Sequence, residues 1–247
     1  MKVVLYKGDC REVLPRLAKE GLRADLLLTD PPYNISNHTT TIVRGKRFSK
    51  YYNPKFDFDH TVEPEEWIPL AAGCLKENAV FVSFVAFQQV GRVMDILQEI
   101  GFRVRHLAAW RKLNPIPQLR KKQWATSLEH IVIATRGEKY HYNWREGHHT
   151  DVIEAPVVQG RERVHPTQKP VKVLKDLIRW WSFRGDTVLD PFAGSGSAGV
   201  AAVELGRNFV GIEIDEKWYR VADRRIPRYQ PLDTFIEAQR KEKLLFF

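Results

Sequence analysis

The sequence predicts an α/β fold with a mostly parallel sheet, helices on both faces and an antiparallel strand at one edge. Short apolar runs alternate with longer amphipathic runs along most of the 247 residues. The run "DLLLTD" (25–30) is almost wholly apolar, as strands buried on both faces of a parallel sheet tend to be. Two strand-like runs, 102–112 and 128–137, follow each other closely, which predicts an antiparallel pair at a sheet edge.

Each element follows from its hydrophobic period and from the residues at its ends. Prolines at 64 and 170 suit the first turn of a helix, and Gly21 suits the end of one. The expected strands are 3–9, 25–30, 79–84, 102–112, 128–137, 186–192 and 208–215. The expected helices are 11–21, 64–78, 87–101, 169–182, 197–206 and 216–226. Residues 137–164 show no clear period and are expected to be irregular.

Composition narrows the class of protein. A hydrophobic content of 43% is enough for a proper core, and no apolar run reaches the length of a membrane span. The N-terminal residues do not resemble a signal peptide. Cys10 and Cys74 are the only cysteines, which suits a reducing cytoplasm and argues against a zinc cluster. The net charge of +9 favours a polyanionic partner, although charge alone does not distinguish nucleic acid from a generally basic surface.

Three acidic residues stand at the ends of expected strands: Asp30, Asp190 and Glu213. Folds of this kind bind ligands beyond the carboxyl ends of parallel strands, where the strand order switches direction. We therefore expect the functional site at this edge of the sheet.

A glycine-rich segment follows the strand 186–192. Gly194, Gly196 and Gly199 have the spacing G-x-G-x-x-G and open a helix, and the next strand ends at Glu213. Glycines let the backbone approach a ligand, and an acid at this distance can accept bonds from ribose hydroxyls. The pattern predicts an adenosine-containing cofactor, either a nicotinamide dinucleotide or S-adenosylmethionine. A simpler explanation is that these glycines only allow close packing of helix and strand.

The stretch "TDPPY" (29–33) distinguishes the two cofactors. Asp30 and the carbonyl of Pro31 could accept the two N–H bonds of an exocyclic amine, which would orient its lone pair for attack on a methyl group. The prolines fix the direction of that carbonyl, and Tyr33 would stack on a base turned out of its duplex. In hydride transfer with a nicotinamide dinucleotide, we find no role for this motif. A purely structural explanation is a turn that ends the strand.

On the strength of these motifs, the chain resembles the amino-methylating DNA methyltransferases that use S-adenosylmethionine, in the circularly permuted β class. The catalytic motif precedes the cofactor motif, as in that class. The matching segments are "GDC" (8–10), "TDPPYN" (29–34), "HPTQKP" (165–170), "DPFAGSG" (190–196) and "GIEID" (211–215). The resemblance implies one catalytic domain over residues 1–247 with a Rossmann-like methyltransferase sheet.

The resemblance also implies roles for single residues. The catalytic set is Asp30, Pro31, Pro32 and Tyr33. The cofactor-binding set is Asp9, Thr167, Lys169, Asp190, Phe192, Gly194, Gly196 and Glu213. Asp9 would face the adenine of the cofactor, but it could instead cap the helix that follows. Lys169 would lie near the cofactor's amino-acid end, but a single lysine is commonly a solvated charge.

The implied reaction is a direct in-line methyl transfer without a metal or a covalent enzyme intermediate. The two cysteines lie in helical sequence and are expected to be structural, and the pair His148 and His149 gives only a weak metal signal. Asp30 in the place of a serine favours adenine N6 over cytosine N4. The sequence also leaves open an RNA or protein-amide methyltransferase and a non-enzymatic DNA-binding protein.

Basic stretches interleaved with aromatic residues predict contacts to double-stranded DNA. The expected DNA-binding residues are Arg44, Lys46, Arg47, Lys50, Arg120, Lys121 and Lys122. A loop at about 35–60 would contact DNA, and a short insert at about 137–164 would recognise the target. Because this insert is short, recognition could be shared with that loop, concern a short site, or need a homodimer. A cognate restriction endonuclease is also left open.

Overall fold

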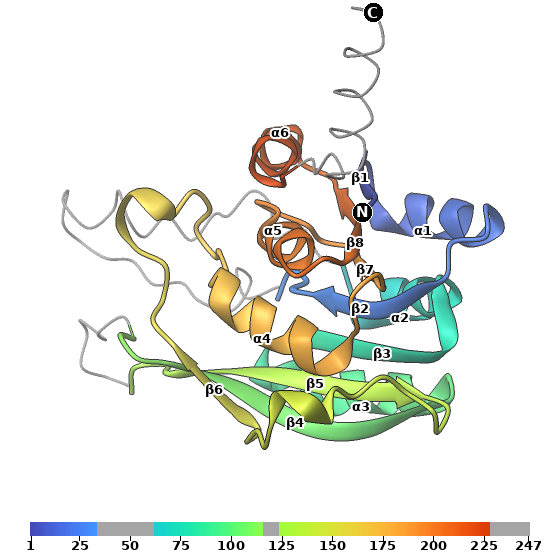
Figure 1. The fold of residues 1–247 in the computed structure, drawn as a ribbon, viewed down its shortest axis with the longest axis horizontal. Helices are drawn as coiled ribbons and strands as arrows, with labels where there is room; N and C mark the ends of the chain where they lie inside the picture. Colours follow the sequence, from blue (N-terminus) through green and yellow to red (C-terminus); the bar gives the residue numbers. More distant parts are fainter. Residues whose placement is uncertain (34–61, 116–123, 228–247) are drawn as a thin grey trace, which may run out of the picture.

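A computed structural model of the protein describes residues 1–33, 62–115 and 124–227 (Figure 1). These residues contain an eight-stranded sheet in the order β1-β8-β7-β2-β3-β5-β4-β6. The strands are β1 (Val3–Lys7), β2 (Ala24–Thr29), β3 (Leu75–Val85), β4 (Phe102–Lys112), β5 (Leu128–Arg136), β6 (Val152–Ala155), β7 (Thr187–Asp190) and β8 (Asn208–Glu213). The α-helices are α1 (Cys10–Lys19), α2 (Pro64–Gly73), α3 (Val90–Glu99), α4 (Val171–Trp181), α5 (Ser197–Glu204) and α6 (Glu216–Arg225). Single 3-10 turns are η2 (Phe87–Gln89), η3 (Trp144–Glu146) and η4 (Gly160–Glu162).

The predicted α/β class is confirmed, with one correction to the sheet. All neighbouring strands pair in parallel except at β5, which is antiparallel to both β3 and β4. The antiparallel strand was predicted at the sheet edge, but it lies inside, because β4 and β6 continue the sheet beyond it. The amino end of β5 therefore lies beside the carboxyl ends of β3 and β4.

Two sequence predictions of local structure are wrong. The helix expected over 64–78 ends at Gly73, and Leu75 already pairs with Ala24 of β2. Residues 137–164 were expected to be irregular, but they include the edge strand β6, which pairs with β4. With four residues, β6 is too short to show a period of its own.

The core lies in two layers, one on each face of the sheet. Helices α1, α2 and α3 cover one face, and α4, α5 and α6 cover the other (Figure 1). Leu27 belongs to the first layer, while Leu26 and Leu28 belong to the second. Burial on both faces explains why the sequence of β2 is a continuous apolar run.

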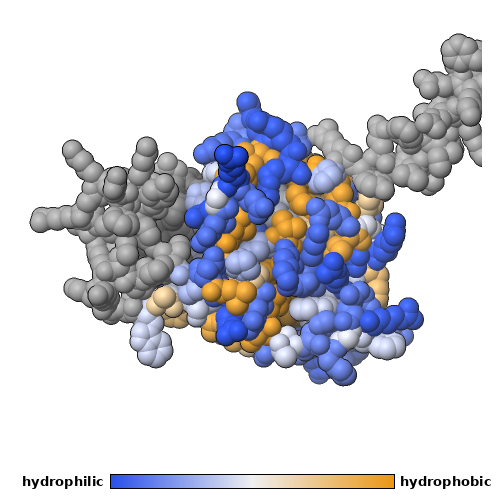
Figure 2. Space-filling view, turned by 60° about the vertical axis from the view of Figure 1, so that its left-hand side comes forward, coloured by the Kyte–Doolittle hydropathy of each residue, from blue (hydrophilic) through white to orange (hydrophobic). Residues whose placement is uncertain are grey.

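The surface is mixed in polarity. On the face shown in Figure 2, apolar residues form patches separated by hydrophilic side chains. Within the described ranges, no helix is both long and apolar enough to cross a membrane.

Candidate active site

Asp30 follows the last residue of β2 and takes part in a buried cluster of charges. The Lys169 ammonium group forms an ion pair with Asp30 and a second one with Glu129 Oε2, at 3.1 Å. Glu129 is the second residue of β5, and its Oε1 lies 2.8 Å from Nζ of Lys112 at the end of β4. Two carboxylates and two ammonium groups thus alternate from β2 across to β4.

Burial and charge together set the protonation states in this cluster. Burial raises the pKa of Asp30, the nearby Lys169 lowers it, and the negative charge of Glu129 raises it further; the net shift is upward. Burial acts to lower the pKa of Lys169, but the two carboxylates outweigh it and the pKa is raised. Burial raises the pKa of Glu129, but the attraction of Lys169 and Lys112 is stronger and the net shift is downward. Lys169 and Glu129 are therefore charged, and Asp30 is the more basic of the two carboxylates.

Tyr33 lies against the same cluster. The Lys169 ammonium is 5.4 Å from the centroid of its ring. Burial, together with the charges of Asp30 and Glu129, holds the pKa of its phenol well above the usual value, so the phenol is neutral. Its hydroxyl and Asp30 Oδ1 are both buried without a hydrogen-bond partner among the described residues. Such atoms are costly to leave unpaired and indicate a place for a polar ligand.

The sequence left two explanations for Lys169, and the structure excludes one of them. Only 6% of the residue is exposed, so it is not a solvated charge. Its described ion pairs are with Asp30 and Glu129, and its role near the cofactor's amino-acid end stays a prediction. A buried lysine needs such partners because an unpaired ammonium is strongly disfavoured away from water.

The glycine loop and Glu213 form the other half of the site. Glu213 ends β8, and its two oxygens accept hydrogen bonds from the amides of Gly194 (2.7 Å) and Asp215 (2.8 Å). These bonds fix the carboxylate, which keeps lone pairs for further donors. Gly194 has φ +52°, and a side chain there would meet only the Phe192 carbonyl, at 3.9 Å. The loop therefore leaves open space beside a fixed acid, as an adenosine-containing cofactor would need.

The other two glycines are explained by packing. A Cβ on Gly196 would lie 3.0 Å from Ala222 of α6, and one on Gly199 would lie 2.5 Å from Ile226. Gly196 also has φ +79°, a conformation that favours glycine. Packing thus accounts for Gly199 and contributes at Gly196, while the predicted cofactor contacts of Gly194 and Gly196 stay predictions.

Asp190 connects the two halves of the site. Its Oδ1 accepts hydrogen bonds from Thr29 Oγ1 (2.7 Å) and from the amide of Phe192 (3.1 Å). Thr29 directly precedes Asp30, and Phe192 begins the glycine loop. Burial raises the pKa of Asp190 to about 7. The buried Asp190 side chain thus contacts the glycine loop at the backbone amide of Phe192.

The other residues predicted to bind the cofactor lie near this edge of the sheet. Asp9 caps α1 by accepting a hydrogen bond from the Arg11 amide, so the predicted capping role is confirmed, and its role toward adenine stays a prediction. Thr167 donates its amide to His165 Nδ1 at 3.2 Å, and the ring of His165 lies edge-on to Trp218 of α6. The ring of Phe192 packs edge-on against Trp67, at 5.2 Å between centroids, which fixes the start of the glycine loop.

Both cysteines are buried and reduced. Burial raises the pKa of the Cys10 thiol to about 12 and that of Cys74 to about 11. Thiols with such pKa values are poor nucleophiles, as expected for structural cysteines.

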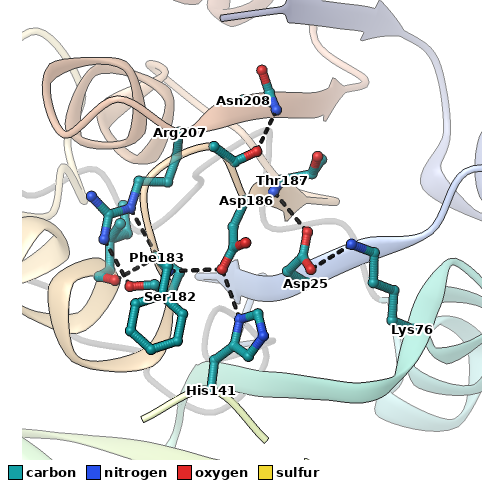
Figure 3. A network of polar contacts seen from close by, with 11 residues as sticks. Asp25, Lys76, His141, Ser182, Phe183, Asp186, Thr187, Arg207 and Asn208 are labelled. Atoms are coloured by element: carbon teal, nitrogen blue, oxygen red, sulfur yellow. Dashed lines mark hydrogen bonds and ion pairs between the residues drawn. The ribbon is translucent and has the colours of Figure 1, made fainter. Parts of the chain in front are cut away.

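At the opposite end of the strands, Asp25, His141 and Asp186 offer ligand atoms within 4.8 Å of one another (Figure 3). Asp25 already accepts bonds from Lys76 and the Thr187 amide, and Asp186 accepts from His141 and the Phe183 amide. The cluster is therefore explained as a hydrogen-bond network of the fold. Of the paired histidines, His149 packs its ring against Trp180, at 4.1 Å between centroids.

Comparison with known proteins identifies the family. The sequence model of the family described as DNA methylase, which acts at N6 or N4 amines, matches residues 24–224. The chain belongs to the N6/N4 DNA methylase family. It is 31% identical over 245 residues to Type II methyltransferase M2.DpnII of Streptococcus pneumoniae, covering 91% of this chain and 90% of the relative. It is 28% identical over 261 residues to M2.MboI of Moraxella bovis, covering 97% and 92%.

Solved structures agree with the DNA methylase fold. The complex of M1.HpyAVI with SAM superimposes with a TM-score of 0.73 at 27% identity, covering 90% of this chain and 98% of that one. The cytosine-N4-specific PvuII DNA methyltransferase gives 0.67 at 16% identity, covering 96% and 91%, which shows a shared fold alone. The expected sheet, with helices on both faces, is therefore that of the family.

Sequence reasoning missed Glu129 and Lys112 in this DNA methylase. Because β5 is antiparallel, its second residue lies at the edge where the parallel strands end. The sequence does show an acid, Glu129, near the start of a mostly apolar strand. It indicates a site residue only when the position of β5 in the sheet is known. The predicted DNA-binding residues at 44–50 and 120–122 lie outside the described residues.

Proposed function

We propose that the protein transfers a methyl group from S-adenosylmethionine to the exocyclic N6 amine of adenine in double-stranded DNA. One observation supports this most directly. Asp30 directly follows β2, and one oxygen of its carboxylate, Oδ1, is buried without a hydrogen-bond partner among the described residues. Asp190 joins this strand end to the glycine loop. An acceptor for an amine and a loop for a cofactor thus lie on neighbouring strands, β2 and β7.

The residues present suit the proposed cofactor, which supplies an electrophilic methyl group on a sulfonium. Glu213 would accept hydrogen bonds from the ribose hydroxyls, and Gly194 would lie against the methionine part. Ile214, which directly follows Glu213, is 53% exposed and offers an apolar surface for the adenine ring. Thr167, with the beginning of α4, would hold the carboxylate of the amino-acid end.

Asp30 and Pro31 would prepare the amine. The carboxylate and the carbonyl accept its two N–H bonds, which turns the nitrogen lone pair toward the methyl carbon. The new N–C bond forms as the electron pair of the C–S bond passes to sulfur. The nitrogen, now cationic, then loses one proton. Asp30 can take this proton because burial raises its pKa.

The choice of adenine rests on Asp30 standing where cytosine-N4 enzymes of the family have serine. Cytosine N4 remains the alternative, because the same two acceptors can hold either amine. An RNA or protein-amide substrate and a non-enzymatic DNA-binding role are less well supported, since the catalytic and cofactor motifs are both intact.

Nucleoside mass spectrometry tests the proposal directly. Unmethylated DNA, amplified in vitro, is incubated with the protein and S-adenosylmethionine and digested to nucleosides. We expect N6-methyldeoxyadenosine. Appearance of N4-methyldeoxycytidine instead would keep the chemistry and change the base, and absence of both products would contradict the function.

The cellular setting and the domain organisation remain predictions. These are the single domain over 1–247, DNA contact by the loop at about 35–60, target recognition by the insert at about 137–164, a homodimer, a cognate endonuclease and a cytoplasmic location. The permuted motif order is likewise proposed from the resemblance.

A further inference from the structure

The Lys169 ammonium is paired with Asp30, the carboxylate that would accept a hydrogen bond from the target amine. Its nitrogen contacts Asp30 Oδ2, and its side chain is held between the rings of Tyr33 and Phe84, with centroids 5.4 and 5.0 Å from Nζ. An ammonium group and an exocyclic amine are both N–H donors to the same acceptor. The structure therefore shows Asp30 paired with a competitor of the proposed substrate.

A cation at this place is also unfavourable for the reaction. The attacking nitrogen becomes positively charged as the N–C bond forms, and a positive charge fixed on Asp30 repels it. The same cation weakens Asp30 as a proton acceptor, because an opposite charge stabilises a carboxylate. Lys169 would have to leave Asp30 for the amine to be held and activated.

Glu129 is already in place to receive that ammonium group. Its Oε2 is 3.1 Å from Lys169 Nζ, while its Oε1 is held by Lys112 at 2.8 Å. Lys112 is anchored in turn, because its amide donates to the Ser127 carbonyl at 2.8 Å. Lys169 is the charged partner of Glu129 Oε2, and the neutral hydroxyl of Tyr33 faces the same carboxylate. A small movement of one side chain, with no backbone change, would move the cation from one carboxylate to the other.

We propose that Glu129 is a positioning residue that draws the Lys169 ammonium away from Asp30 when the target amine binds. The inference rests on the proposed amine methylation. In this proposal, Lys169 forms the ion pair with Asp30 until the substrate binds and takes its place. The competing explanation is that Lys169 and Glu129 only balance buried charge and do not move.

A double-mutant cycle distinguishes these explanations. The variants are Glu129→Gln, Lys169→Met and the combination of both. The control is Glu138→Gln, an acid at the far end of β5 that pairs with Arg103 on the surface. For each variant we would measure the initial rate of methyl transfer to unmethylated amplified DNA, binding of S-adenosylmethionine, and thermal unfolding.

The proposal predicts a different rate of methyl transfer for the single and the combined variant. Glu129→Gln should lower kcat by about tenfold or more, because the ammonium then has only Asp30 as a carboxylate partner. The combined variant should recover most of that loss, because the competing cation is gone. Cofactor binding by Glu129→Gln and the rate of the control variant should stay at the wild-type level.

Two outcomes would overturn the proposal. Glu129→Gln with wild-type kcat would remove the role of Glu129, and a combined variant as slow as Glu129→Gln would show that Lys169 assists rather than competes. If a variant unfolds, Glu129→Asp provides the same test, because it keeps the charge and shortens the reach to Lys169; unchanged kcat in this variant would also contradict the proposal. A wild-type protein without methyl transfer would instead contradict the proposed function.

Discussion

Asp30 is the residue on which the proposed chemistry depends most. We expect Asp30→Ala to lower methyl transfer by more than about 100-fold, because the amine loses its acceptor. The fold should persist, since Lys169 keeps Glu129 as a counter-charge. Cofactor binding, measured by titration, should be unchanged.

The control for this variant is Asp95→Ala, which removes an exposed acid of α3 and should leave the rate as it is. An Asp30→Ala protein that methylates DNA at the wild-type rate would show that another group holds the amine.

Two glycines of one motif should respond differently to the same substitution. In Gly194→Ala the new methyl group enters the open space of the loop, so we expect cofactor affinity to fall about tenfold with a stability loss of about 1 kcal/mol from the left-handed backbone. In Gly199→Ala the methyl group meets Ile226 and Phe209 at less than 3 Å. That variant should lose about 1–3 kcal/mol of stability through overpacking.

Calorimetric titration and denaturant unfolding of both variants test this division. If Gly199→Ala weakened cofactor binding at unchanged stability, the packing explanation of that glycine would be wrong.

At the scale of elements, Asp190 should make stability depend on pH. Burial raises its pKa to about 7, above the ordinary 3.8. Between these values the folded protein keeps a proton that the unfolded chain has released, so the free energy of unfolding falls as pH rises through this window. Asp190→Asn cannot ionise and still can accept bonds from Thr29 and Phe192.

The stability of Asp190→Asn relative to the wild type should therefore rise with pH, on the order of 1 kcal/mol per pH unit between about pH 4 and 7, and level off above. Denaturant unfolding at several pH values measures this difference. Asp95→Asn provides the comparison, and a difference independent of pH for Asp190→Asn would show that Asp190 is ionised in the folded state.

The elements also show what sequence could and could not predict. The strands β2 and β8 are recognisable as apolar runs and the helices α4 and α6 by their helical period, and the motifs at the ends of such elements locate Asp30, Gly194 and Glu213. The position of β5 depends on pairings with β3 and β4, which no local pattern records. Because β5 was expected at the edge, the pairing of Glu129 with Lys169, 40 positions later in the chain, could not be foreseen.

For the whole molecule, the fold brings together segments that are far apart in the chain. Thr29 bonds Asp190, 161 positions away, so the amine-holding half and the cofactor half are fixed to each other. This rigid edge of the sheet needs a DNA-binding surface beside it. The net charge of +9 and the basic stretch at 120–122, which follows β4, are the sequence features that predict one.

The combined substitution of Arg120, Lys121 and Lys122 by alanine should weaken DNA binding across all sequences. Each phosphate contact that is lost should reduce the steepness of the salt dependence by about one unit on a log–log plot. The matched control removes Lys19, Lys139 and Arg184, three exposed basic residues at the opposite end of the sheet, and keeps the same net charge as the test variant. Binding isotherms at several salt concentrations separate local contact from overall charge. Equal losses in the two variants would mean that total charge, and not this stretch, holds the DNA, whereas a loss confined to the first variant would assign these three residues to the surface beside Asp30.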